Sequence, residues 1–189
     1  MSKLGELKEI LKKLIAIPSV TGNEHDIAIY IADYLRQCGV DSVELQPVEG
    51  KRLNVVAHLK GEKVGPVVLL TGHMDTVAPG EGWRTDPFKA TERDGRIYGR
   101  GAADMKGGIA AILVAIRNAA AQREQMRGEA IIAFVCDEEA YSKGVDALIR
   151  SGIRADYGIA AEPEWDAVIG AVGKMLIKVR VYGIAAHGS

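Results

Sequence analysis

Three short apolar runs, each followed by polar residues, limit most strongly the folds that this chain can adopt. They are PVVLL (66–70), AIIAFV (130–135) and YGIAA (157–161). Unbroken apolar runs of this length are typical of strands that are buried on both faces. Because segments with a helical pattern separate them, the sequence predicts an α/β fold with a mainly parallel sheet flanked by helices.

Four segments carry apolar residues at helical spacing and are predicted as helices. The first ends before Pro18. The second follows Thr21 and Glu24, which have the spacing of a capping box, and stops at Gly39. The other two are expected from Lys106 to about residue 122 and over residues 143–151.

The remaining segments are predicted as two strands, a long loop and a further strand that has one face in water. Residues 42–46 and 53–59 have strand patterns, with a turn-forming segment between them. Residues 78–98 are rich in Gly, Pro and Asp, which predicts a long loop of the kind that is often functional. In LIKVRVY (176–182) apolar and polar residues alternate, which indicates a half-solvated strand at the entry to a second domain.

The composition excludes several classes of protein. Hydrophobic residues make up 48% of the 189 residues, which is enough for a core, and the net charge of −1 gives no basic excess for nucleic acid or membrane surfaces. No run is apolar enough for a signal peptide or a transmembrane helix. Cys38 and Cys136 lie in apolar patterns and are interpreted as buried free thiols. A cytoplasmic protein without nucleic-acid or membrane partners is expected.

Polar side chains collect where the apolar runs end. The runs lead in turn to His73 with Asp75, to Glu138 with Glu139, and to Glu162. Asp104 lies in GRGAADMKGG, at the start of the Ala-rich helix. Because the carboxyl ends of parallel strands line one edge of a sheet, these residues can converge although they are far apart in sequence.

A group of carboxylates around an imidazole would repel itself unless a cation held it together, and these ligands suit Zn²⁺ or a similar divalent ion. In an extended segment His73 and Asp75 point the same way, so Asp75 can hold the ring of a metal-bound His73. The adjacent Glu138 and Glu139 cannot both aim at one point from a strand. One of them can therefore be a ligand while the other acts as a base.

Each signal also has a simpler interpretation. A single His after a strand is more often structural than a ligand, and DEE is usually a solvated acidic turn. GRGAADMKGG could be a Gly-rich phosphate loop, but Asp104 would then face the pyrophosphate, which disfavours a nucleotide-binding domain. The coincidence of three strand ends with matching chemistry favours the metal site.

The chain resembles the M20-type family of dinuclear zinc aminoacylases and carboxypeptidases, which includes acetylornithine deacetylase and succinyl-diaminopimelate desuccinylase. The resemblance rests on motifs in the same order along the chain: IPSVTGNE, GHMDTV, WRTDPF, DGRIYGRGAADMKGG, DEE, AEP and AAHGS. It implies His73 and Glu162 on one zinc, Glu139 on the other and Asp104 bridging both. It also implies Glu138 as the general base, Asp75 as the clamp on His73, and a cis peptide at Asp104–Met105.

The resemblance also implies a domain organisation, in which a smaller lid and dimerisation domain interrupts the catalytic domain. Residues 1–172 would be the N-terminal part of the catalytic domain, and residues 173–189 the first strand of the lid. His187 in AAHGS matches a lid histidine that helps to hold the scissile carbonyl oxygen. A homodimer is expected, with two Zn²⁺ for which Co²⁺ could substitute. The second zinc site would be incomplete in this chain.

The implied activity is hydrolysis of the amide bond of N-acyl amino acids by a water that two metal ions activate, as in a deacetylase or desuccinylase. A di- or carboxypeptidase of the same family is the first alternative. A non-catalytic, metal-binding fragment is an alternative of another class for these 189 residues. Glu138 distinguishes the two classes, because a protein that only binds metal has no use for a base beside a ligand.

Overall fold

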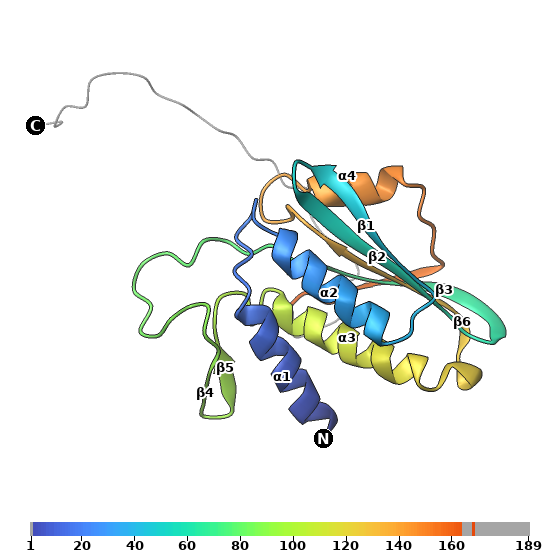
Figure 1. The fold of residues 1–189 in the computed structure, drawn as a ribbon, viewed down its shortest axis with the longest axis horizontal. Coiled ribbons are helices and arrows are strands. Elements are labelled where there is room, and N and C mark those ends of the chain that lie inside the picture. Colours follow the sequence, from blue (N-terminus) through green and yellow to red (C-terminus); the bar gives the residue numbers. More distant parts are fainter. Residues whose placement is uncertain (1, 164–167, 169–189) are drawn as a thin grey trace, which may run out of the picture.

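The computed structural model describes residues 2–163 and residue 168. A five-stranded sheet has the order β1-β2-β6-β3-β7, and β4 and β5 form a separate hairpin (Figure 1). The strands are β1 (Ser42–Glu49), β2 (Arg52–Lys60), β3 (Lys63–His73), β4 (Thr91–Arg93), β5 (Arg96–Tyr98), β6 (Arg127–Val135) and β7 (Tyr157–Ala160). The helices are α1 (Lys3–Ile15), α2 (His25–Gln37), α3 (Lys106–Ala120) and α4 (Lys143–Arg150), with a 3-10 turn, η1, at Arg123–Gln125.

The sheet is mixed. β3 pairs in parallel with both β6 and β7, whereas β2 is antiparallel to both β1 and β6. Gly50 and Lys51 alone separate β1 from β2, and so short a connection permits only an antiparallel hairpin. The predicted α/β fold, a sheet flanked by helices, is confirmed, but the sheet is not mainly parallel, because β2 is antiparallel to both of its neighbours. The parallel half is the half that carries the polar strand ends.

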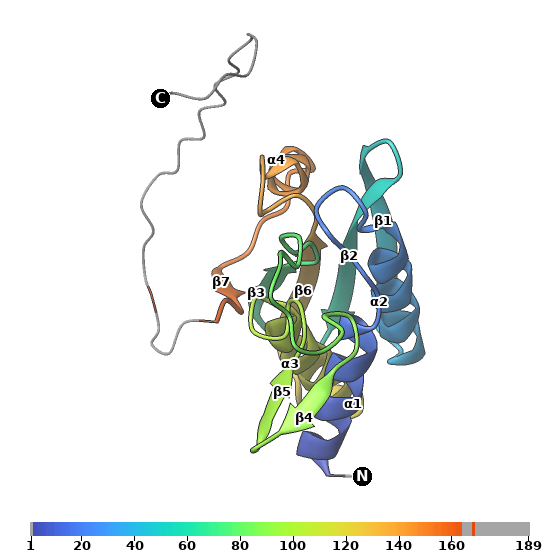
Figure 2. The ribbon, with the colours of Figure 1, turned by 90° about the vertical axis from the view of Figure 1, so that its left-hand side faces the viewer.

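Helices cover both faces of the sheet (Figure 2). On one face, alternate residues of β2 and β6, among them Leu59 and Phe134, belong to a core shared with α1, α2 and α3. On the other face, Val56 and Val135 pack with Leu148 of α4 in a smaller cluster. β2 and β6 are therefore buried on both sides, as the run AIIAFV predicts for β6.

The burial predicted for the other two apolar runs is not observed in full. Residues 67–71 of β3 are only half-buried, and all four residues of β7 are exposed. Tyr157 and Ile159 have relative exposures of 66% and 56%. β7 is exposed because it is an edge strand among the described residues. An apolar run in the sequence does not reveal which strand lies at an edge.

The long loop and the capping box are each corrected in one respect. Residues 91–98 of the predicted loop form the β4–β5 hairpin, whose turn residues Asp94 and Gly95 both have positive φ, as a tight Asp-Gly hairpin requires. Glu24 is the N-cap residue of α2 but makes no side-chain cap. Its carboxylate accepts instead from the Gly22 amide and from Arg52, and Thr21 donates to Asp75.

Other sequence features keep their predicted character. Gly39 has φ 74° just beyond α2, as a helix-stop glycine should. Cys136 is buried and Cys38 half-buried, and both are free. No helix in the described part of the chain is long and apolar enough to cross a membrane. The predicted strand 176–182 lies outside the described residues.

Lys106, the first residue of α3, is a fully buried lysine. Its ammonium donates to the backbone carbonyl oxygens of Leu14 at 2.9 Å and Ile17 at 2.8 Å. Leu14 lies in the last turn of α1 and Ile17 just beyond it, and the helix dipole favours a cation at this end. The side chain thus fastens the end of α1 to the start of α3, and burial lowers the pKa of Lys106 to about 8.

The lowered pKa of Lys106 predicts a pH-dependent stability. The unfolded chain keeps this proton up to about pH 10.5, whereas the folded protein loses it near pH 8. Between these values the unfolded state binds more protons, so the free energy of unfolding rises with pH, by at most about 1.4 kcal/mol per unit. Chemical denaturation at pH 8, 9 and 10 should show this rise in the wild type relative to Lys106→Met. Lys13→Met replaces an exposed lysine of α1 and is the control. The wild type should show no such rise relative to Lys13→Met, and an equal rise there would contradict the assignment to Lys106.

Candidate metal site

The parallel pairing of β3 with β6 and β7 brings three polar strand ends to one edge of the sheet. His73 is the last residue of β3 and pairs with Val135 at the end of β6. Glu138 and Glu139 follow β6, and Glu162 follows β7. The convergence expected from the apolar runs is therefore a property of the fold.

His73 lies at the centre of this group. Its Nε2 is 2.9 Å from Oδ1 of Asp104 and 3.8 Å from Oε2 of Glu162. His73, Asp104 and Glu139 each offer one ligand atom, and these atoms lie within 4.8 Å of one another. The imidazole is buried at 2% exposure, whereas the Asp104 side chain is 53% exposed, so the group is open to solvent on its carboxylate side.

The other ring nitrogen of His73 faces the backbone of Asp75. Nδ1 is 2.9 Å from the backbone oxygen of Asp75 and 3.7 Å from its carboxylate Oδ1. A carbonyl oxygen can only accept, so Nδ1 carries a proton. In a neutral ring the lone pair is then on Nε2, which is the nitrogen that faces Asp104.

The carboxylate of Asp75 binds the turn that follows β6. It accepts hydrogen bonds from the backbone amides of Glu138 at 3.0 Å and Glu139 at 3.1 Å. The Thr21 hydroxyl also donates to it, at 2.9 Å. Asp75 is fully buried, so its charge is satisfied by these donors and it fixes the backbone of both glutamates. Sequence reasoning places Asp75 beside His73 but does not anticipate its contacts with Thr21 and the glutamate amides.

The charges of the group shift the pKa values of its members. Burial lowers the pKa of His73, but Glu162, Asp75 and Asp104 outweigh burial and raise it above its ordinary value. Burial also raises the pKa of Glu139, and the nearby Asp104 carboxylate adds to the shift. The neighbouring carboxylates thus contribute to both shifts.

A divalent metal ion fits these residues. The Nε2 lone pair and the Asp104 carboxylate are both acceptors, and 2.9 Å is too close for two acceptors without a proton or a cation between them. Two tetrahedral zinc ligands with ordinary bond lengths would be about 3.4 Å apart, so a small adjustment would suffice. Imidazole with carboxylates is a ligand set that zinc uses.

Met105 joins the end of β3 to the segment that carries Asp104. The backbone amide of His73 lies 2.9 Å from the sulfur of Met105, which is fully buried. A Cβ at Gly72 would lie too close to the Met105 methyl group, so a larger residue there would force the Met105 side chain to shift. The Asp104–Met105 peptide is cis, as the family resemblance implies.

The structure brings together four of the predicted residues: His73, Asp104, Glu139 and Glu162. Glu138 is adjacent to them, and its half-buried side chain helps to raise the pKa of Glu139. His187 lies outside the described residues.

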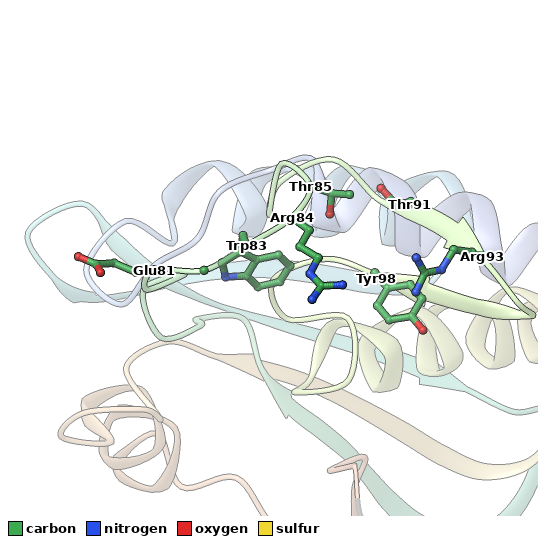
Figure 3. Close-up of a pocket in the computed structure, with 8 residues that line it drawn as sticks. Glu81, Trp83, Arg84, Thr85, Thr91, Arg93 and Tyr98 are labelled. Atoms are coloured by element: carbon green, nitrogen blue, oxygen red, sulfur yellow. The ribbon is translucent and has the colours of Figure 1, made fainter.

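A separate pocket lies in the segment between Asp75 and Asp104 (Figure 3). Its volume is about 360 Å³, and it is lined by Glu81, Gly82, Trp83, Arg84, Thr85, Thr91, Arg93 and Tyr98. The guanidinium of Arg100 lies over the Trp83 ring at 5.4 Å and supports the loop. None of the predicted site residues lines this pocket.

Comparison with known proteins identifies a matching protein family and enzymes of similar sequence. The model of peptidase family M20/M25/M40 matches residues 69–182. Succinyl-diaminopimelate desuccinylase of Nautilia profundicola is 34% identical over 193 residues, covering 95% of this chain and 50% of that enzyme. The enzyme of the same name from Bordetella avium is 38% identical over 173 residues, covering 88% of this chain and 45% of that enzyme.

Among solved structures, an M20 family metallo-carboxypeptidase from Sulfolobus solfataricus is similar to this chain, with a TM-score of 0.73 and 25% identity. The similarity covers 82% of this chain and 37% of that protein. This chain spans about half the length of the curated relatives that it matches.

The contacts of Asp75 predict that its replacement weakens metal binding without abolishing it. In Asp75→Asn the amide nitrogen would face a backbone N–H, so Glu138 or Glu139 would lose its acceptor. Partners of this kind are typically worth about 10–100-fold in metal affinity, and zinc affinity should fall by that factor in calorimetry. Thr21→Val, which removes only the hydroxyl, should lower zinc affinity by a smaller factor. If Asp75→Asn empties the site as completely as His73→Ala does, Asp75 is itself a ligand.

Proposed function

This chain belongs to peptidase family M20/M25/M40, and on that premise we propose that the protein is a metal-dependent hydrolase that cleaves the amide bond of N-acyl amino acids. The proposal is carried by one observation, the gathering of His73, Asp104 and Glu139 within 4.8 Å of one another at one sheet edge. The two desuccinylase relatives support an N-acyl amino acid as the substrate.

The proposed ligands divide between two ions. His73 and Glu162 would hold one, Glu139 would hold the other, and Asp104 would serve both, with zinc as the proposed metal and cobalt as a substitute. Nδ1 of His73 is occupied by the Asp75 backbone, which leaves Nε2 as the ligand atom. When bound, zinc would polarise the amide carbonyl and lower the pKa of the attacking water towards roughly 7.

Glu138 is the proposed general base. A carboxylate oxygen of Glu138 takes a proton from the water while the water oxygen bonds to the carbonyl carbon. The same carboxyl group then gives the proton to the amine nitrogen as the C–N bond breaks. Its backbone amide is bound to Asp75, beside the proposed ligand Glu139, so the side chain starts from a fixed position.

The remaining assignments concern the whole protein. His187 is proposed to hold the scissile carbonyl oxygen from a lid domain that begins at residue 173, and residues 1–172 are proposed to belong to the catalytic domain. A homodimer in the cytoplasm remains a prediction.

Two alternatives are tested by the same substrate panel. The likeness to a metallo-carboxypeptidase favours a peptidase as the second candidate. N-acetyl and N-succinyl amino acids and dipeptides should be offered to the zinc- and cobalt-loaded whole protein. Turnover of the acyl substrates alone supports a deacylase, and turnover of the dipeptides alone supports a peptidase. No turnover with bound metal would contradict both and leave a metal-binding protein.

Replacement of Glu138 should separate catalysis from metal binding. Glu138→Ala in the whole protein should keep the metal content and lose activity by at least about 100-fold, the scale of general-base catalysis. Metal analysis and steady-state kinetics measure the two effects. Glu124→Ala, which changes an exposed glutamate of η1, serves as the control. Activity retained in Glu138→Ala would rule out this residue as the base.

The ligand assignment predicts the zinc stoichiometry of the 189-residue chain. His73, Asp104 and Glu162 supply three protein ligands to one ion, the usual number at a catalytic zinc, whereas Asp104 and Glu139 supply two to the other. Calorimetry should find close to one tightly bound zinc, with no measurable hydrolysis. Glu162→Gln should weaken this zinc more than Glu139→Gln does. Two equally tight zincs, or clear turnover, would show that a ligand is misplaced.

A further inference from the structure

The turn that carries Glu138 and Glu139 begins at Asp137, whose backbone has the left-handed φ of 68°. Asp137 is buried, and its carboxylate accepts a hydrogen bond from the Lys143 amide at the start of α4, at 3.1 Å. Its backbone oxygen accepts from the Ser142 amide at 2.7 Å. Asp137 therefore closes the turn 137–143 from both its side chain and its backbone.

Arg52 of β2 joins this buried carboxylate to a second one. Its guanidinium is 2.8 Å from Oδ1 of Asp137. It also donates through Nε, at 2.9 Å, and through a second nitrogen to the carboxylate of Glu24. The Glu24 side chain is fully buried, and that of Arg52 is 12% exposed. Two buried anions thus share one cation, and the carboxylate of the exposed Glu49 lies 3.9 Å from the same guanidinium.

Glu24 leads back to the same turn by a second route. Its carboxylate accepts from the Gly22 amide at 3.0 Å, which fixes the segment that carries Thr21. Thr21 donates to Asp75, and Asp75 accepts from the amides of Glu138 and Glu139. Contacts therefore run in a closed ring from Arg52 to the two glutamates, through Asp137 on one side and through Glu24 on the other.

We propose that Arg52 is a positioning residue for Glu138 and Glu139, which it holds in place through Asp137 and Glu24 without contacting the metal group. A planar guanidinium can bind Glu24 with two nitrogens and still reach Asp137, whereas a lysine ammonium is a single point and cannot reproduce that geometry. The inference rests on the proposed function, in which these two glutamates serve as base and ligand.

The test compares Arg52→Lys with the wild-type whole protein. Arg52→Lys keeps the positive charge between the buried carboxylates, so the variant should fold. We expect zinc affinity to fall by about 10–100-fold and kcat to fall at least tenfold with little change in KM. We also expect amide hydrogen exchange at Glu138 and Glu139 to accelerate at least tenfold, while exchange in the centre of β6 is unchanged.

Two further variants keep the test decisive. Arg117→Lys changes a different ion pair, in which the guanidinium of α3 lies 2.7 Å from Glu6 of α1, and should change none of these quantities. Asp137→Asn should reproduce the Arg52→Lys effects, because Asn tolerates a positive φ but lacks the charge. If Arg52 acts through Asp137, the double variant should be little worse than either single variant.

Each outcome decides the proposal. Unchanged exchange at Glu138 and Glu139 in a folded Arg52→Lys protein would overturn it, and so would exchange that accelerates equally throughout β6. Additive effects of the two substitutions would overturn the route through Asp137. Hydrogen exchange needs no substrate, so a wild-type protein that hydrolyses nothing would count against the proposed function and not against the role of Arg52.

Discussion

The parallel pairing of β3 with β6 is the contact on which the rest of this structure depends. It sets His73 opposite Val135, so that the chain leaves both strands at the same edge and in the same direction. β7 adds its own carboxyl end through its pairing with β3. Antiparallel pairing would send one of these polar ends to the far side of the sheet. Direction of pairing, more than any single side chain, creates the site.

The same pairing gathers negative charge, and the surrounding residues compensate for it. Asp75 is satisfied by two backbone amides and a hydroxyl, and Asp137 and Glu24 share Arg52. Buried carboxylates are tolerated only where such donors meet them. The carboxylates of Asp104, Glu139 and Glu162 are more exposed and face His73, which leaves them available to a cation. Charges that hold the backbone in place are thus separated from charges that can bind a ligand.

Much of this arrangement can be predicted from the sequence, because apolar runs and helical spacing report burial directly. The helix from Lys106, the strand AIIAFV and the gathering of His73 with Asp104 and Glu139 follow from such patterns. The exposure of β7 does not, since an edge strand has the same composition as a central one. Nor do the partners of Thr21 and Glu24, whose spacing indicates a capping box. Their actual contacts, Asp75 and Arg52, depend on side chains that meet only after distant segments have packed.

The long separations in sequence within the group around His73 also determine when that group can exist during folding. His73 and Asp104 are 31 residues apart, and the β3–β6 pairing joins residues 62 apart, such as Thr71 and Ala133. Closing loops of this length is entropically costly and contributes to slow folding. An unfolded or half-folded chain cannot gather these side chains, so a metal ion would bind the completed sheet alone and pull the folding equilibrium towards it. Uptake of metal would then report completion of the sheet.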